Sequence, residues 1–185
     1  MTNAALKVPQ ERTMHVVQGE YRVIRDPRIV LSTILGSCVA TCIWDDVAGV
    51  GGMNHFLLPG DDGAGSDQLK YGVNAMELLI NGLLKEGATR GRLRGKLFGG
   101  AHVVRSLGDI GAKNAAFAQR FLALECIPCV GQSLGGDQAR RVRFWPTTGR
   151  ASQLLLESTQ ASELLAERQL QPAPADPSAG KVELF

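Results

Sequence analysis

The chain has 185 residues, of which 44% are hydrophobic and 21% are charged. This is enough for one compact domain with a sizeable core, and it excludes a disordered or fibrous chain. The formal net charge of +2 excludes a strongly basic, nucleic-acid-binding protein.

The first half of the chain predicts strands followed by a helix. Residues 1–14 are polar, and we expect them to be loose. Alternating apolar residues predict short strands at 19–24 and 28–35, and then a β-hairpin whose turn covers 45–48. After a Gly/Asp/Ser loop at 60–67, a helix over 69–86 is predicted, with Ser66 or Asp67 as its cap. Its buried face is expected to carry Leu69, Val73, Met76, Ile80 and Leu83.

The second half alternates strands and helices less regularly. A strand at 92–98 ends at Gly99-Gly100, and a helix capped by Asn114 follows, with Phe117, Phe121 and Leu124 along one stripe. Strands are expected at 127–133 and 140–145, a strand or short helix at 152–156, and a helix at 161–170.

These elements predict a single α+β domain over residues 15–170, with a mixed, sandwich-like β-sheet core flanked by helices. Residues 171–185 form a Pro/Ala-rich tail whose last residues, 182–185, are mostly apolar. Because four such residues are costly to leave in water, we expect them to pack back as a short strand.

The hairpin brings together a candidate catalytic pair, Cys38 and His55. If Trp44 pairs with Gly49, Cys38 lies directly opposite His55, where cross-strand Cβ atoms are about 4.5–5.5 Å apart. An imidazole at that separation can take the thiol proton, so the pair is typical of a nucleophile and its base. A bulge among the nearby glycines would change this register. A helix beginning at Cys38 is the alternative, and it would also favour a thiolate.

The neighbouring residues suggest supporting roles. The backbone N–H groups of Ser37 and Cys38 follow a glycine and are candidates to hold a developing oxyanion. The hydroxyl of Ser32, or alternatively that of Thr33, is a candidate to orient His55. The competing interpretation is structural, because most cysteines are simply buried and a core histidine commonly donates to a backbone carbonyl.

The other cysteines predict less. Cys126 and Cys129 form a single C-x-x-C that closes a helix and opens a strand, whereas a thioredoxin motif opens a helix. Cys42 is expected to lie in the core. We therefore predict no metal and no cofactor. The sequence has no membrane-spanning run and no apolar signal-peptide core, so we expect a cytoplasmic protein with thiols rather than disulfides.

Three motifs together resemble one known family. They are LGSC at 35–38, GGMNHFLLP at 51–59 and KLFGGA at 96–101. In combination they closely resemble the CheD family of chemoreceptor glutamine deamidases, and the likeness covers about residues 15–150. It implies a fold similar to the catalytic domain of bacterial deamidating toxins.

The resemblance also implies a reaction and its residues. Cys38 and His55 fall on the family's catalytic cysteine and histidine. The family's third member, a threonine, falls on Ser32, with Thr33 beside it. The implied reaction converts specific glutamines of methyl-accepting chemotaxis receptors to glutamate and releases ammonia, without a metal or cofactor. The family further implies binding to the phosphatase CheC in some chemotaxis systems.

Two other functions stay open at this stage. A catalytically weak adaptor that binds receptors or CheC is the alternative that the Ser32 departure favours. From the residues alone, a transglutaminase, a protease or a methylesterase with the same Cys–His pair is also compatible with the sequence.

Overall fold

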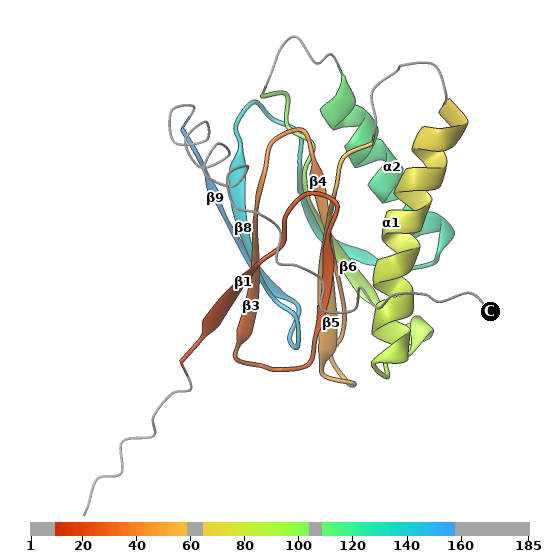
Figure 1. Ribbon diagram of the computed structural model, residues 1–185, viewed down its shortest axis with the longest axis vertical. Coiled ribbons are helices and arrows are strands. Elements are labelled where there is room, and N and C mark those ends of the chain that lie inside the picture. Colours follow the sequence, from red (N-terminus) through yellow and green to blue (C-terminus); the bar gives the residue numbers. More distant parts are fainter. Residues whose placement is uncertain (1–9, 59–64, 104–108, 158–185) are drawn as a thin grey trace, which may run out of the picture.

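The protein is a two-sheet sandwich with helices covering one outer face (Figure 1). A computed structural model describes residues 10–58, 65–103 and 109–157. The expected helix at 161–170 and the tail at 171–185 lie outside these residues. Within them, one sheet has the strand order β1-β3-β8-β9 and the other the order β2-β5-β4-β6-β7.

The strands of the first sheet are β1 (Arg12–His15), β3 (Ile29–Leu35), β8 (Arg140–Trp145) and β9 (Arg150–Leu155). Those of the second sheet are β2 (Tyr21–Ile24), β5 (Val50–Phe56), β4 (Val39–Asp45), β6 (Arg94–Gly99) and β7 (Cys129–Leu134). Helices α1 (Gly65–Lys85) and α2 (Ile110–Leu124) lie on the second sheet, and a short 3-10 helix, η1 (Arg90–Arg92), precedes β6.

The second sheet is covered by the helices on one face and by the first sheet on the other, and its central strand β4 contributes side chains to both cores. Val39 and Ile43 of β4 belong to the core beneath the helices, whereas Ala40, Cys42 and Trp44 belong to the core between the sheets. Every residue of β4 and β5 is therefore buried. The expected α+β class, with a sandwich-like core of mixed sheets flanked by helices, is confirmed.

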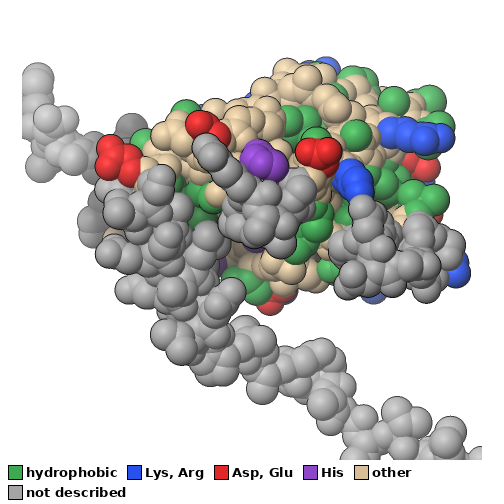
Figure 2. All heavy atoms as spheres, turned by 90° about the horizontal axis from the view of Figure 1, so that it is seen from above, with side chains coloured by type: hydrophobic (Ala, Val, Ile, Leu, Met, Phe, Trp, Pro, Cys, Tyr) green, Lys and Arg blue, Asp and Glu red, His purple; other side chains and the backbone are tan. Residues whose placement is uncertain are grey.

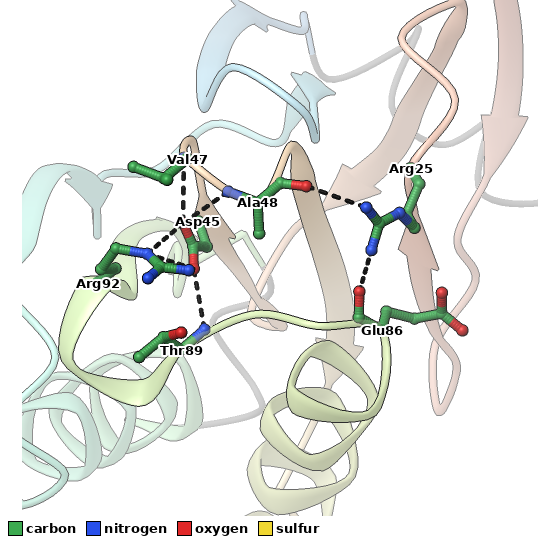
Figure 3. Close-up of polar contacts among 7 residues, drawn as sticks. All are labelled: Arg25, Asp45, Val47, Ala48, Glu86, Thr89 and Arg92. Atoms are coloured by element: carbon green, nitrogen blue, oxygen red, sulfur yellow. Dashed lines mark hydrogen bonds and ion pairs between the residues drawn. The ribbon is translucent and has the colours of Figure 1, made fainter.

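The β4–β5 hairpin forms as predicted, but its register differs by two residues. Trp44 pairs with Gly51, and Ala40, not Cys38, lies opposite His55. The reason is Asp45, which remains in the strand and accepts hydrogen bonds from the turn N–H groups at 47 and 48 (Figure 3). A shift of two residues leaves each side chain on the same face of the sheet, so Cys38 stays on the face that the predicted register gave it.

Asp45 also links the β4–β5 turn to the segment that follows α1. Its carboxylate also accepts from Thr89 N at 2.9 Å and forms an ion pair with Arg92 at 2.9 Å (Figure 3). Nearby, Arg25 donates to the carbonyls of Ala48 and Glu86, which ties the turn to the end of α1. Burial alone would raise the pKa of Asp45, but these hydrogen bonds and the Arg92 charge outweigh it and lower the pKa to about 2.

Some helix predictions were wrong in detail. Helix α1 begins at Gly65, before the expected cap, and Leu69 is exposed rather than buried. Its end at Gly87 is confirmed, because Gly87 has φ 95° and the Gly87 and Ala88 N–H groups bond back to the last turn. Leu124 is also exposed.

Two further differences concern α2 and β1. Asn114 does not cap α2 but lies inside it, since the helix begins at Ile110. Strand β1 begins at Arg12, within the segment that was expected to be loose, and pairs in parallel with β3.

Candidate active site

The predicted site residues gather at one end of the sandwich, the upper end in Figure 1. The loop at 36–38 crosses from β3 in one sheet to β4 in the other, and β5 and β6 both end beside it. Figure 2 looks down on this end, where histidine and acidic side chains are exposed, although His55 itself is buried. Because several strands end here, side chains from both sheets can meet.

His55 is buried, with 6% of its surface exposed, and it contacts Thr33 across the two sheets. The Thr33 Oγ1 lies 2.9 Å from His55 Nδ1. The same hydroxyl donates its only proton to the Val16 carbonyl at 2.7 Å. It must therefore accept a hydrogen bond from Nδ1–H, and the lone pair of the neutral imidazole lies on Nε2. The Val16 oxygen, 3.4 Å from Nδ1, requires the same tautomer.

The hydroxyl at His55 thus belongs to Thr33 and not to Ser32. In β3, Leu31 and Leu35 face the second sheet, and Thr33 shares their parity. Ser32 is buried too, but it points to the opposite face of the strand. The contact that the sequence assigned first to Ser32 is therefore made by its neighbour.

The loop that carries Cys38 is anchored by its carbonyl groups. The carbonyls of residues 36, 37 and 38 accept hydrogen bonds from Ala101 N at 2.8 Å, Asn114 Nδ2 at 2.9 Å and Gly100 N at 2.7 Å, respectively. In a trans peptide the C=O and the following N–H point in opposite directions. The N–H groups of Ser37 and Cys38 therefore face away from β6 and α2.

The glycines after β6 are required by this anchoring. A Cβ at Gly99, which has φ 109°, would lie 2.1 Å from the Cys38 carbonyl oxygen. A Cβ at Gly111 would lie 2.7 Å from the Gly100 carbonyl oxygen, so α2 packs directly on the same turn. The FGGA motif, which predicted the end of a strand, also supports the cysteine loop.

Asn114 was missed as a site residue because it was assigned to a helix cap. It is fully buried, and besides holding the Ser37 carbonyl it accepts a hydrogen bond from Leu58 N at 2.8 Å. One amide side chain therefore joins the cysteine loop to the chain that leaves β5 just after His55. Its sequence signal was its place within the likeness to the family, which covers about residues 15–150.

The Cys38 thiol is half-buried and neutral. Burial raises the pKa of Cys38 to about 11. Its sulfur donates to the side-chain carbonyl oxygen of Gln18, with Sγ and Oε1 3.5 Å apart. Gln18 lies in the β1–β2 turn and was not predicted as a site residue. Cys38 immediately precedes β4, which excludes the expected alternative of a helix starting there.

The β1–β2 turn is fixed to both sheets. Val16 N donates to Ser32 O at 2.9 Å, and Gly19 N donates to His55 O at 2.8 Å. His55 N in turn donates to Glu20 O at 3.0 Å. Between this turn and α1 lies a small pocket of about 20 Å³, with His55, Asn54 and Ala75 in its wall. That volume suffices for a water molecule.

The remaining cysteines lie apart from this site. Cys42 is fully buried, as expected, and burial raises the pKa of its thiol. Cys126 and Cys129 are exposed thiols at the end of α2 and the start of β7. Among the described residues, no group of three His, Cys, Asp or Glu side chains is arranged to hold a metal ion. No helix within them is long and apolar enough to cross a membrane.

Comparison with known proteins points to one family. A family model described as CheD chemotactic sensory transduction matches residues 57–153. A protein of Acidiphilium cryptum, named probable chemoreceptor glutamine deamidase CheD, is 55% identical over the full length of both chains. A relative of the same name from Rhizobium leguminosarum is 52% identical and aligns with 94% of this chain and 96% of its own.

Solved structures are much more distant. A crystal structure of a Neisseria meningitidis protein covers 68% of this chain and 63% of its own, with 10% identity and a TM-score of 0.43. A likeness of this size carries no information about activity.

Proposed function

The chain belongs to the CheD family of chemoreceptor glutamine deamidases, and we propose that Cys38 and His55 carry out the deamidation. The observation that carries this assignment is the hydrogen bond from His55 Nδ1 to Thr33. It fixes the imidazole tautomer in which Nε2 is the base, and it does so at the end of the sandwich where the Cys38 loop is anchored.

The first step is attack on the amide. A receptor glutamine places its side-chain carboxamide at Cys38, His55 Nε2 takes the thiol proton, and the sulfur bonds to the carboxamide carbon. The C=O electron pair moves to oxygen as the tetrahedral intermediate forms. The N–H groups of Ser37 and Cys38 are the donors for this oxyanion. The carbonyls of the same two peptide groups are hydrogen-bonded on the opposite side of the loop, which leaves these N–H groups facing away from those contacts.

The second step releases ammonia and the third regenerates the thiol. His55 gives its proton to the departing nitrogen, which leaves as ammonia, and a thioester remains on Cys38. His55 then takes a proton from water, whose oxygen attacks the thioester carbon. The sulfur leaves and regains a proton, and the glutamine has become glutamate.

The product differs from the substrate in charge. Each converted glutamine adds one negative charge to a receptor helix and creates a carboxylate that can be methylated. A new charge of this kind changes helix–helix packing. Binding to CheC and a cytoplasmic location remain predictions that follow from family membership.

The adaptor alternative rested on Ser32, which departs from the family's threonine. Thr33 provides a hydroxyl at His55, so the departure no longer argues for lost catalysis. Activity itself is what separates the two functions.

The test is incubation with a purified receptor cytoplasmic fragment, followed by mass spectrometry of its glutamine-containing peptides. We expect the wild-type protein to convert glutamine to glutamate and Cys38→Ala to convert none. Cys126→Ala is the matched control, because it removes an exposed thiol outside the site and should keep full activity. An unchanged receptor, or an active Cys38→Ala variant, would contradict the assignment.

A further inference from the structure

The thiol of Cys38 donates to a glutamine of its own chain, and that side chain ends in the same carboxamide as the substrate. We propose that Gln18 is a positioning residue that holds the Cys38 thiol by a hydrogen bond and occupies the place of the substrate carboxamide until a receptor glutamine displaces it. This inference rests on the deamidase function proposed above.

The position of Gln18 is set by its backbone. The residues on either side are fixed, Val16 by hydrogen bonds to β3 and Gly19 by its hydrogen bond to the end of β5. Glu20 N donates to Val17 O at 3.0 Å, which closes a tight turn around Gln18, and Gly19 has φ 86°. The backbone of the turn is therefore fixed, and it places the Gln18 side chain next to Cys38.

The side chain itself can leave. Gln18 is exposed, whereas Val16, which anchors the turn, is fully buried. Rotation of one exposed glutamine side chain breaks a weak sulfur hydrogen bond and no core contact. The turn can stay in place while the carboxamide moves out and a receptor carboxamide moves in.

The contact with Gln18 is incompatible with the first chemical step. A thiol that donates to Oε1 is stabilised in its protonated form, and an amide oxygen is too weak a base to remove the proton. In the proposed mechanism the same proton must go to His55 Nε2. The thiol must therefore turn away from Gln18 before the sulfur can attack, and arrival of the substrate provides the reason to do so.

Alkylation of Cys38 by iodoacetamide tests the inference without any receptor. The rate is measured on the full chain by residue-resolved mass spectrometry, with the exposed Cys126 and Cys129 as internal references. We expect Gln18→Ala to alkylate roughly two- to tenfold faster at Cys38, the loss of one hydrogen bond to the thiol. Gln18→Glu should alkylate more slowly than wild type, because a carboxylate accepts the same hydrogen bond and its charge disfavours a thiolate.

Opposite effects from two substitutions at one position exclude a merely structural role. Gln132→Ala is the matched control, since Gln132 is exposed and its Oε1 accepts from Gln119 instead. It should leave the Cys38 rate unchanged. Thermal unfolding checks that all variants are folded.

Receptor kinetics supply the second readout. With a receptor fragment as substrate, Gln18→Ala should lower KM and leave kcat unchanged, because it removes an internal competitor and not a reacting group. If the wild type deamidates receptors while Gln18→Ala alters neither the alkylation rate nor KM, the inference is wrong and the function stands. If Gln18→Ala alkylates faster but the wild type deamidates no receptor, the function is wrong and Gln18 still masks the thiol.

Discussion

Replacement of Thr33 by valine tests the hydrogen bond on which the assignment of His55 depends. Thr33→Val keeps the β-branched shape of a fully buried side chain and removes only the hydroxyl oxygen. His55 Nδ1–H then loses its 2.9 Å contact and is left with the longer one to the Val16 carbonyl, 3.4 Å away. The imidazole loses the contact that fixes both its orientation and its tautomer.

The expected loss follows from the cost of an unpaired buried polar group. That cost is about 1–3 kcal/mol, and both the imidazole N–H and the Val16 carbonyl lose a partner. If the same free energy is lost from orientation of the base, kcat falls roughly 5- to 150-fold. KM should stay near its wild-type value, because Thr33 lies behind the imidazole rather than at the substrate.

The assay is ammonia release from a receptor fragment, with kcat and KM determined separately for four proteins. Thr33→Ser retains a hydroxyl and should keep most of kcat. Ser32→Ala is the matched control, since Ser32 lies on the opposite face of β3 and should leave kcat unchanged. The ¹⁵N chemical shifts of His55 report the tautomer directly. Wild-type kcat and unchanged His55 shifts in Thr33→Val, or equal losses in Ser32→Ala, would refute the reasoning.

Three further predictions concern the supports of the site and the far end of the fold. Asp45→Asn should lower the free energy of unfolding in urea by about 1–3 kcal/mol. Because the folded pKa of Asp45 is about 2 and its ordinary value is 3.8, this contribution is present above about pH 4 and lost toward pH 2, so the variant should show a flatter acid limb. Gly99→Ala should abolish activity or folding, whereas Gly135→Ala, also at positive φ but with open space around it, should cost far less in Tm. Asn114→Ala should lower both Tm and kcat, and an unchanged kcat would show that the anchored loop is dispensable.

The strands were predictable because their signals are local. Val39, Thr41 and Ile43 alternate with Ala40 and Cys42, and each set fills a different core, so a period of two was sufficient. Helix α1 likewise showed its buried face at Met76, Ile80 and Leu83.

The register and the third site residue depend on contacts far apart in the sequence. Asp45 stays in β4 because it accepts hydrogen bonds from the turn and is also held by Thr89 and Arg92. The last two residues follow α1 in the chain, so no local pattern shows them as partners. The choice between Ser32 and Thr33 requires knowing that β3 belongs to the opposite sheet from His55. A strand pattern gives the parity of each side chain but not the sheet to which the strand belongs.

The protonation state of Cys38 explains why replacement of Thr33 should lower kcat. Burial raises the pKa of Cys38 to about 11, so the resting thiol is protonated at neutral pH. A preformed thiolate would need no base for its attack, and the orientation of the imidazole would matter only when the nitrogen leaves. A neutral thiol must lose its proton as the sulfur attacks, so the base must already be neutral, correctly oriented and basic at Nε2. In the proposed mechanism Thr33 prepares the base from one sheet, while the segment after β6 and α2 hold the cysteine loop at the other. The arriving carboxamide then couples a thiol that is unreactive at rest to a base that is oriented in advance.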